Sequence, residues 1–203
     1  MQRYQKMLQA NRAWVEGKLR LRPDFFTQTA KGQQPELLWI GCSDSRVPAE
    51  EITGAEPGEL FVHRNIANQV IAGDASLLSV LQYAVDVLKV RRIIVCGHTH
   101  CGGVAYAMTD GGWSTVDRWL DRLRSLRRQN EQELKKISDE EERFDRLVEL
   151  NLRAQLRNLA QTETVRDAWS RGALLPLHGW IYDLRTGLLE EVETLDAKSA
   201  QLC

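Results

Sequence analysis

Three side chains of types that bind transition metals occur in two short segments of the sequence. Cys42 begins the run Cys-Ser-Asp-Ser-Arg, and His98 and Cys101 belong to the run Gly-His-Thr-His-Cys-Gly-Gly. Two thiolates and one imidazole suit zinc, which accepts sulfur and nitrogen ligands in a tetrahedron. Three protein ligands leave the fourth position to water, as in catalytic zinc sites. The residue types therefore predict one catalytic zinc ion per chain.

The first run also carries a carboxylate and a guanidinium two residues apart. Asp44 and Arg46 can form a bidentate pair beside the metal. A carboxylate fixed in this way can orient a nucleophile at the metal through a hydrogen bond. An ordinary salt bridge within the loop is the alternative interpretation of these two residues.

Two glycines follow the last of the three metal-binding residues. Gly102 and Gly103 precede an apolar helical segment at 104–108. Backbone N–H groups at a helix start can bind the oxygen of a small substrate, and glycine allows the close approach. A tight turn without a ligand is equally compatible with the two glycines.

Short apolar segments place both polar runs at the ends of strands. Residues 37–40, 60–62 and 93–96 are typical of buried parallel strands, and the polar runs follow the first and the third of them. Between the second and third strands, apolar residues at helical spacing are Leu77, Leu78, Leu81, Val85 and Leu88. Because parallel neighbours end at the same edge of a sheet, we expect the metal-binding residues to converge at that edge.

Further helices are predicted downstream of the second polar run. Ser114 and Ser138 each precede an acidic residue by three positions, which is the pattern of a capping box at a helix start. A shorter helix is predicted from about Thr164, and Gly172 suits the left-handed position that ends it.

The two ends of the chain complete the predicted fold. Residues 1–21 have the pattern of an amphipathic helix, expected to form an arm. Residues 174–183 and 188–192 predict an antiparallel hairpin at the sheet edge. We therefore expect a single α/β domain over residues 1–203, with a mainly parallel central sheet, flanking helices, an N-terminal helical arm and a C-terminal antiparallel edge hairpin.

Composition narrows the classes of partner. The 203 residues include 27 Lys plus Arg and 28 Asp plus Glu, giving a net charge of −1, so nucleic acid and anionic membranes are not expected as partners. No segment approaches the ~20 apolar residues of a membrane span, and the N-terminus lacks the apolar core of a signal peptide. Four cysteines are too few for a disulfide scaffold. We expect a cytoplasmic protein that acts on a small molecule.

Three motif blocks in the same order and spacing resemble those of the beta-class carbonic anhydrases. The blocks are residues 42–46, residues 61–68 (Phe-Val-His-Arg-Asn-Ile-Ala-Asn) and residues 97–103. The likeness extends from about residue 37 to residue 183. It implies the α/β fold given above and assembly as a homodimer or homotetramer.

The resemblance also implies an activity, which is the reversible hydration of carbon dioxide to bicarbonate and a proton. Zinc on Cys42, His98 and Cys101 would make hydroxide available near neutral pH. Asp44 would accept the hydrogen bond of that hydroxide, and Arg46 would orient Asp44. Because two thiolates already neutralise the metal, we expect an alkaline activity optimum.

Within the family, the chain resembles a bacterial subgroup that binds a second, inhibitory bicarbonate at an allosteric site. The matching residues are Trp39, Arg64 and Tyr182, whose indole N–H, guanidinium and phenol can donate to a small anion. Core packing is the alternative role for the two aromatic residues.

The subgroup resemblance implies a switch in the loop after the first strand. Arg64 pairs with Glu50 when the second site is empty, and bicarbonate displaces that pair. The loop at Val47 then moves, and Asp44 becomes a fourth zinc ligand in a closed state. Lower pH would favour closure, because one anionic ligand replaces another.

Two other functional classes remain open on the sequence. A bicarbonate sensor without catalytic activity would hold zinc with Asp44 bound to it most of the time. A structural zinc protein or a thiol redox protein would instead use Cys42 and Cys101 as a reversible pair.

Overall fold

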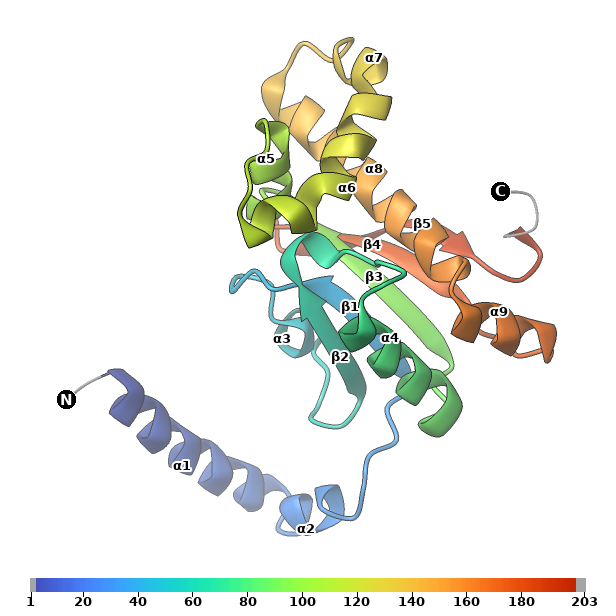
Figure 1. Ribbon diagram of the computed structural model, residues 1–203. Helices are drawn as coiled ribbons and strands as arrows, with labels where there is room; N and C mark the ends of the chain where they lie inside the picture. The colour runs from blue at the N-terminus through green and yellow to red at the C-terminus, as the bar shows by residue number, and fades with distance from the viewer. Residues whose placement is uncertain (1–2, 200–203) are drawn as a thin grey trace. The chain divides into compact units, whose positions relative to one another are not determined.

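Within residues 3–199, which the structure describes, a five-stranded sheet forms the centre of the unit that begins at Pro35 (Figure 1). This structure is a computed structural model. The strands lie in the order β2-β1-β3-β4-β5, where β5 alone runs antiparallel to its neighbour. The strands are β1 (Leu37–Cys42), β2 (Leu60–Asn65), β3 (Arg92–His98), β4 (Leu177–Asp183) and β5 (Leu188–Leu195). The α/β fold with an antiparallel edge hairpin is confirmed.

Helices connect and cover these strands. The α-helices are α1 (Arg3–Leu21), α2 (Phe25–Thr29), α3 (Ala49–Thr53), α4 (Ala75–Gln82), α5 (Gly102–Met108), α6 (Thr115–Gln129), α7 (Glu131–Leu134), α8 (Glu140–Ala160) and α9 (Glu163–Ser170). A 3-10 turn, η1 (Ile66–Asn68), follows β2, and a π turn, η2 (Tyr83–Val87), continues α4. The helix predicted between the second and third strands is therefore present, with a wider last turn.

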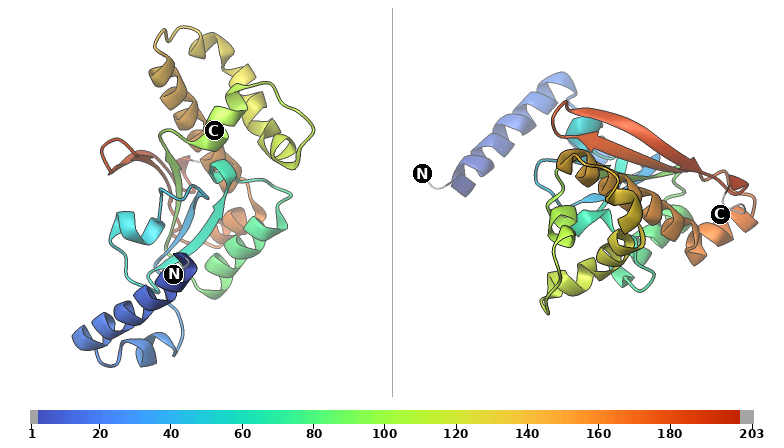
Figure 2. Two further views of the ribbon diagram at one scale, coloured as in Figure 1. Left: turned by 90° about the vertical axis from the view of Figure 1, so that its left-hand side faces the viewer. Right: turned by 90° about the horizontal axis from the view of Figure 1, so that it is seen from above.

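The central strands β1 and β3 are buried on both faces, which explains why they are apolar without alternation. Leu38 and Ile40 of β1 pack in one cluster with apolar residues of α4, α8 and α9. Trp39 packs on the other face with Ile94 of β3 and with Ala49 of α3. In Figure 2, α3 and α4 lie on opposite sides of the strands. The central strands of the sheet are thus held between two layers.

The arrangement of β1 and β3 decides where the polar runs meet. The two strands are parallel neighbours, with Gly41 opposite Cys96. Their carboxyl ends therefore emerge at the same edge of the sheet, as the sequence predicts. Cys42 is the last residue of β1, and His98 is the last residue of β3.

Two of the three helix-end residues predicted from the sequence, Ser114 and Gly172, are confirmed in the structure. Ser114 caps α6 in a capping box, and Gly172 follows α9 with φ of +79°. The predicted cap at Ser138 is wrong by one residue, because Asp139 caps α8 and accepts a hydrogen bond from the Glu142 amide at 2.8 Å. A carboxylate is the better choice at this place, since its charge also complements the helix dipole.

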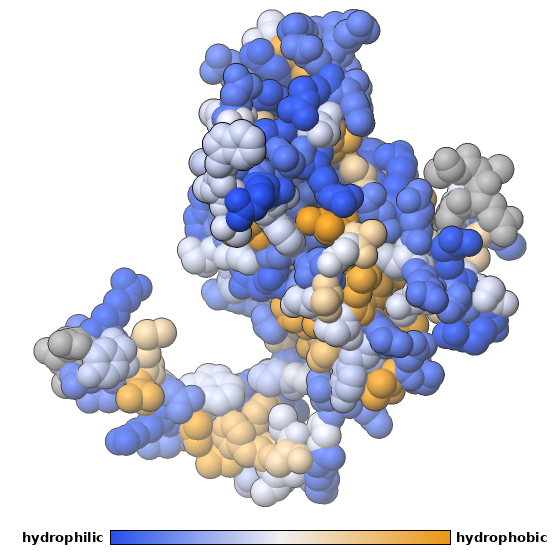
Figure 3. All heavy atoms as spheres, in the orientation of Figure 1, coloured by the Kyte–Doolittle hydropathy of each residue, from blue (hydrophilic) through white to orange (hydrophobic). Residues whose placement is uncertain are grey.

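The unit before Pro35 is described separately. It contains α1, none of whose residues is buried, and the short helix α2. Trp14 packs edge-on against Phe26 with ring centroids 5.5 Å apart, and Arg22 lies over the ring of Phe25 at 4.6 Å. Apolar residues of this unit appear orange in Figure 3, whereas the surface over α6 and α7 is mostly hydrophilic. Met1, Gln2 and residues 200–203, with Cys203, lie outside the described residues.

None of the helices between residues 3 and 199 combines the length and the apolar character that crossing a membrane requires.

Candidate metal centre

Cys42, His98 and Cys101 meet at the carboxyl edge of the sheet. Their ligand atoms lie within 4.8 Å of one another, and all three residues are buried. The two sulfurs are 3.9 Å apart. Two sulfurs bound to one zinc at ~2.3 Å with a tetrahedral angle would lie about 3.8 Å apart, whereas a disulfide needs ~2.05 Å. The spacing fits a shared metal and excludes a disulfide in this structure.

The imidazole of His98 is oriented for metal binding. Its Nδ1 lies 2.8 Å from the carbonyl oxygen of Thr99. Since a carbonyl only accepts, Nδ1 carries the proton and Nε2 carries the lone pair. Among the described residues Nε2 has no hydrogen-bond partner, although it is buried. A buried acceptor without a partner costs free energy, and a metal ion removes that cost.

The two thiols have opposite pKa shifts. The pKa of Cys42 is lowered, chiefly because its sulfur accepts a hydrogen bond from the Cys101 thiol. The pKa of Cys101 is raised, because it donates that hydrogen bond and is buried. The metal-free pair therefore holds one proton and one negative charge, and metal binding displaces the remaining proton.

Asp44 and Arg46 form a bidentate ion pair beside this cluster. Arg46 donates from Nε to Oδ1 at 2.9 Å and from Nη2 to Oδ2 at 2.7 Å, and Nη2 also donates to the carbonyl of His100 at 3.0 Å. These hydrogen bonds lower the pKa of Asp44 to about 2. Oδ2 lies 3.7 Å from Nε2 of His98. A carboxylate with a lowered pKa thus stands next to the unpartnered nitrogen of His98.

The two glycines expected to bind substrate have different surroundings. A Cβ at Gly103 would lie 2.9 Å from Cβ of Ala67, so glycine is required there for close packing. The amides of Val104 and Gly103 hydrogen-bond the sulfur of Cys101. A Cβ at Gly102 would contact nothing within 4 Å. The Gly102 amide therefore has room for a small substrate beside it, and the role of the Gly103 amide as a second donor stays a prediction.

The three residues of the predicted bicarbonate site lie on the α3 face of the sheet or at its edge. Trp39 and Tyr182 belong to the same apolar cluster, and Arg64 of β2 pairs in register with Gly41. Trp180 packs edge-on against Trp39, with ring centroids 6.2 Å apart. The three residues therefore lie on three strands, β2, β1 and β4, and β3 separates Tyr182 from the other two.

Arg64 does not have the partner that the resemblance implies. Its guanidinium donates from Nε to the carbonyl of Cys42 at 2.8 Å and from Nη2 to the carbonyl of Asp44 at 2.5 Å. Among the described residues, these two carbonyls are the hydrogen-bond partners of Arg64, where the resemblance implies the carboxylate of Glu50. The chain leaves β1 at Cys42, so its carbonyls there lack a strand partner, and the guanidinium satisfies them.

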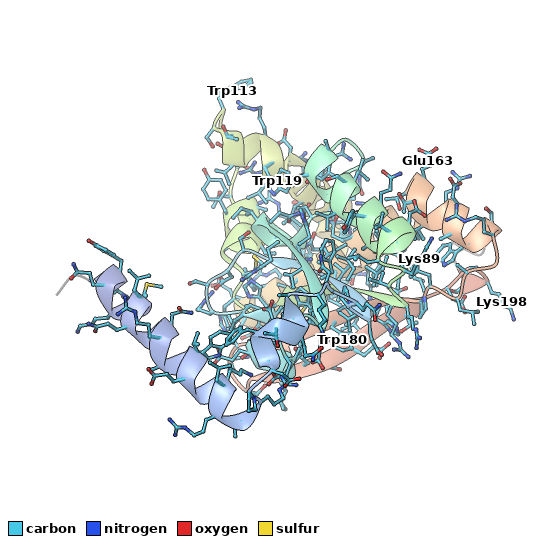
Figure 4. All side chains as sticks on the ribbon, turned by 90° about the horizontal axis from the view of Figure 1, so that it is seen from below. Lys89, Trp113, Trp119, Glu163, Trp180 and Lys198 are labelled. Atoms are coloured by element: carbon cyan, nitrogen blue, oxygen red, sulfur yellow. The ribbon has the colours of Figure 1, made fainter. Side chains whose placement is uncertain are left out.

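A pocket adjoins the metal centre at Ser43, the residue after the first metal-binding cysteine. Its volume is about 980 Å³, and its lining includes Asn65, Ile66 and Trp119. Trp119 closes one side and donates its indole N–H to the carbonyl of Ile66 at 2.9 Å. Figure 4 shows Trp119 nearer the sheet than Trp113, which projects from the loop before α6.

The hydrogen bonds of Thr99, which lies between His98 and His100, were not predicted from the sequence. The Thr99 hydroxyl donates to Asp183 at 3.2 Å and accepts from the amide of Leu184 at 2.9 Å. Asp183 also accepts from Nε of Arg185 at 3.0 Å. A polar residue between two histidines was the available signal, but its partners lie more than 80 positions away.

Asp183 gives a testable dependence of stability on pH. The hydrogen bonds from Arg185 lower the pKa of Asp183 to about 2, below the ~3.9 of an unfolded aspartate. Asp183 therefore stabilises the fold above about pH 4, and this contribution disappears as the pH falls towards 2. We expect Asp183→Asn to be less stable than the parent at pH 6, and the difference to vanish near pH 2.

Chemical denaturation at several pH values measures this difference. Acid also protonates the metal ligands of both proteins, so the difference between the two proteins carries the test rather than the absolute stability. A gap that stays constant from pH 6 to pH 2 would contradict the assignment.

Comparison with known proteins identifies the family. The chain matches the carbonic anhydrase family over residues 37–189. A carbonic anhydrase of Emericella nidulans is 47% identical over 191 residues, 94% of this chain and 84% of that protein. One from Pseudomonas aeruginosa is 37% identical over 179 residues, 85% of this chain and 80% of that protein.

A solved structure places the chain more closely within that family. A beta-carbonic anhydrase of Sordaria macrospora, described as tetrameric, superposes with a TM-score of 0.90 at 42% identity, covering 95% of this chain and 98% of that chain. It is similar in fold over nearly the whole length, and the Cys-His-Cys cluster lies at the edge described above. The chain therefore belongs to the beta-class carbonic anhydrases, enzymes that use zinc.

Proposed function

We propose that this carbonic anhydrase hydrates carbon dioxide reversibly at a zinc ion held by Cys42, His98 and Cys101. The observation that supports this ligand set is the unpartnered Nε2 of His98, buried beside two sulfurs 3.9 Å apart. Zinc at this position supplies Lewis acidity, lowering the pKa of a bound water and polarising substrate oxygen.

Asp44 and Arg46 are the proposed catalytic pair. Oδ2 of Asp44 accepts a hydrogen bond from the attacking water and orients its lone pair towards carbon dioxide. Arg46 keeps that carboxylate ionised and fixed, and the His100 carbonyl fixes Arg46 in turn. The Gly102 amide is the proposed donor to substrate oxygen, and the pocket at Ser43 is the proposed route of entry.

The state of the Asp44–Arg46 pair favours an enzyme over a sensor held closed. Both carboxylate oxygens are hydrogen-bonded to Arg46 in this structure. To reach the metal, Asp44 would have to give up that pair. Stopped-flow hydration of carbon dioxide from neutral to alkaline pH tests catalysis, and a protein with bound zinc but no turnover at any pH would overturn it.

A second bicarbonate site at Trp39, Arg64 and Tyr182 is proposed as an inhibitory switch. It is supported by the two hydrogen bonds from Arg64 to the carbonyls of Cys42 and Asp44. A bicarbonate ion would compete for the same guanidinium N–H groups. The loop carrying Asp44 would then lose its tie, which would let it move towards the metal.

This version of the switch differs from the one implied by resemblance. Bicarbonate would release main-chain carbonyls rather than Glu50, and Val47 would move with the freed loop. The expected subgroup is bacterial, whereas the relatives described above are fungal and bacterial. The proposal therefore rests on the side chains and not on the origin of the protein.

Arg64→Ala removes both the anion donor and the tie on the Asp44 loop, so we expect lower activity without bicarbonate. The bicarbonate concentration that half-inhibits the remaining activity should rise by at least about tenfold, the value of one charge-assisted hydrogen bond. Trp39→Phe, which keeps the ring but removes the N–H, should raise it about fivefold. The measurement is carbon dioxide hydration with added bicarbonate, together with zinc content, which should not change in either variant.

Trp180→Phe is the matched control for the tryptophan substitution. Trp180 packs against Trp39 on the same face, so it reports on packing without the proposed donor. Its inhibition by bicarbonate should equal that of the parent. Parent-like inhibition in both Arg64→Ala and Trp39→Phe would remove the second site.

We further propose one domain over residues 1–203, a homodimer or homotetramer, and a cytoplasmic location. The tetrameric state described for the Sordaria macrospora protein supports assembly. The exposed apolar side chains of α1, such as Met7 and Leu8, would suit an interface between copies. Light scattering on the purified protein measures the oligomeric state.

A further inference from the structure

Two successive residues next to the metal centre have a left-handed backbone without being glycine. Ala67 has φ of +61° and Asn68 has φ of +45°, and both are buried. Non-glycine residues rarely adopt this region, because the Cβ crowds the following carbonyl. Other interactions must therefore stabilise the conformation, and such sites often have a functional reason.

Buried amide side chains hold this turn through its carbonyl. Asn151 of α8 donates from Nδ2 to the carbonyl of Ala67 at 3.1 Å, and Gln69 donates from Nε2 to the same oxygen at 2.9 Å. Oδ1 of Asn151 accepts from Nε2 of Gln69 at 2.8 Å and from Nε2 of Gln155 at 2.9 Å. Asn151 is 1% exposed. It joins α8 to the turn and is the centre of the network.

The other side of the same turn contacts a metal-binding residue. Ala67 packs in one buried cluster with Cys42 and Cys101, and its Cβ lies where a Cβ at Gly103, two residues after Cys101, would come within 2.9 Å. The amide of Ser43 donates to the carbonyl of Asn65 at 2.9 Å, which keeps the two segments in register. The left-handed turn thus packs Ala67 against the two metal-binding cysteines, while its carbonyl accepts a hydrogen bond from α8.

We propose that Asn151 is a positioning residue for the zinc site, because it holds the carbonyl of Ala67 and thereby keeps Ala67 packed against Cys42 and Cys101. This inference rests on the proposed role of Cys42 as a zinc ligand. Groups that hydrogen-bond a metal ligand tune its donation and orientation, and their loss typically lowers metal affinity by about 10- to 100-fold. Asn151 acts one step further out, through the backbone.

The same substitution at another asparagine of α8 supplies a matched control. Asn158 lies two turns further along the helix, and its Nδ2 donates to the carbonyl of Val70 at 3.1 Å and to Oε1 of Gln155 at 3.2 Å; among the described residues it makes no bond to Ala67. Asn158→Leu therefore removes a similar amide that does not hold Ala67. Asn151→Leu removes the amide that does. Asn151→Asp has the same shape and keeps the acceptor, but it places a buried carboxylate oxygen against the carbonyl of Ala67.

We expect Asn151→Leu and Asn151→Asp to weaken zinc binding about tenfold in competition with a chelator. In the cobalt-substituted protein, the sulfur-to-metal charge-transfer band should shift in both variants. In nuclear magnetic resonance, the amide of Ala67 should exchange with solvent at least about tenfold faster. Asn158→Leu should leave all three measurements as in the parent, even where it lowers thermal stability.

The outcomes separate this inference from the proposed function. Unchanged exchange at Ala67 in the Asn151 variants overturns the positioning role, and so does an equal loss of zinc affinity in Asn158→Leu. If the parent binds no zinc while Ala67 exchanges faster only in the Asn151 variants, the ligand assignment fails and the positioning contact stands.

Discussion

Replacing Cys101 by serine is expected to remove zinc and, with it, carbon dioxide hydration. Thiolate and imidazole zinc sites bind with roughly 12 kcal/mol, so one of three ligands contributes about 4 kcal/mol, or roughly 1,000-fold in affinity. A serine hydroxyl is protonated at neutral pH and is a poor ligand for zinc. The variant should bind well below one zinc per chain after dialysis, and its activity should fall by about the same factor.

Cys96→Ser is the control for this substitution. Cys96 is also buried but lies within β3, and its thiol donates to the carbonyl of Gly97. Burial raises the pKa of Cys96, so this sulfur stays protonated and is not available to a metal. Zinc content measured by elemental analysis, before and after a chelator and zinc addition, should match the parent. Full zinc content in Cys101→Ser would mean that another donor completes the site.

The sequence predicts the position of the metal centre because that position depends on strand ends. Runs of buried apolar residues that stop at Cys42 and His98 define two strands, and parallel pairing then brings their ends together. The loop ion pair at Asp44 and Arg46 is equally local, since the two residues are close in sequence. Local patterns are what a single sequence records best.

The partners of Arg64 and the conformation of Ala67 could not be predicted in the same way. Arg64 bonds the carbonyls of Cys42 and Asp44 rather than the carboxylate of Glu50, because β2 lies against the end of β1. Ala67 carries no glycine or proline signal, and its left-handed backbone depends on Asn151, 84 positions away. Such choices are made by tertiary contacts, which override local preference. The cap at Asp139 instead of Ser138 is a smaller case, because both residues are acceptable caps.

The second substitution with a large expected effect on catalysis is at Asp44. In the proposed mechanism its carboxylate supplies a negative charge and orients the attacking water, but does not bind the metal. Its carboxylate is held on both oxygens by Arg46 and stands 3.7 Å from Nε2 of His98. An asparagine has the same shape but one acceptor oxygen, so it cannot keep the bidentate pair. It also cannot orient water with a negative charge. The zinc ligands themselves are untouched by this substitution.

We therefore expect Asp44→Asn to lower kcat about 100-fold while zinc content and KM stay close to the parent. Because the pKa of Asp44 is near 2, the carboxylate is ionised at every pH of the assay, and the loss should be similar at each. Asp86→Asn, which breaks the surface ion pair with Arg171, is the matched control and should leave kcat unchanged. Loss of zinc in Asp44→Asn would instead make Asp44 a permanent ligand, and unchanged kcat would exclude it from catalysis.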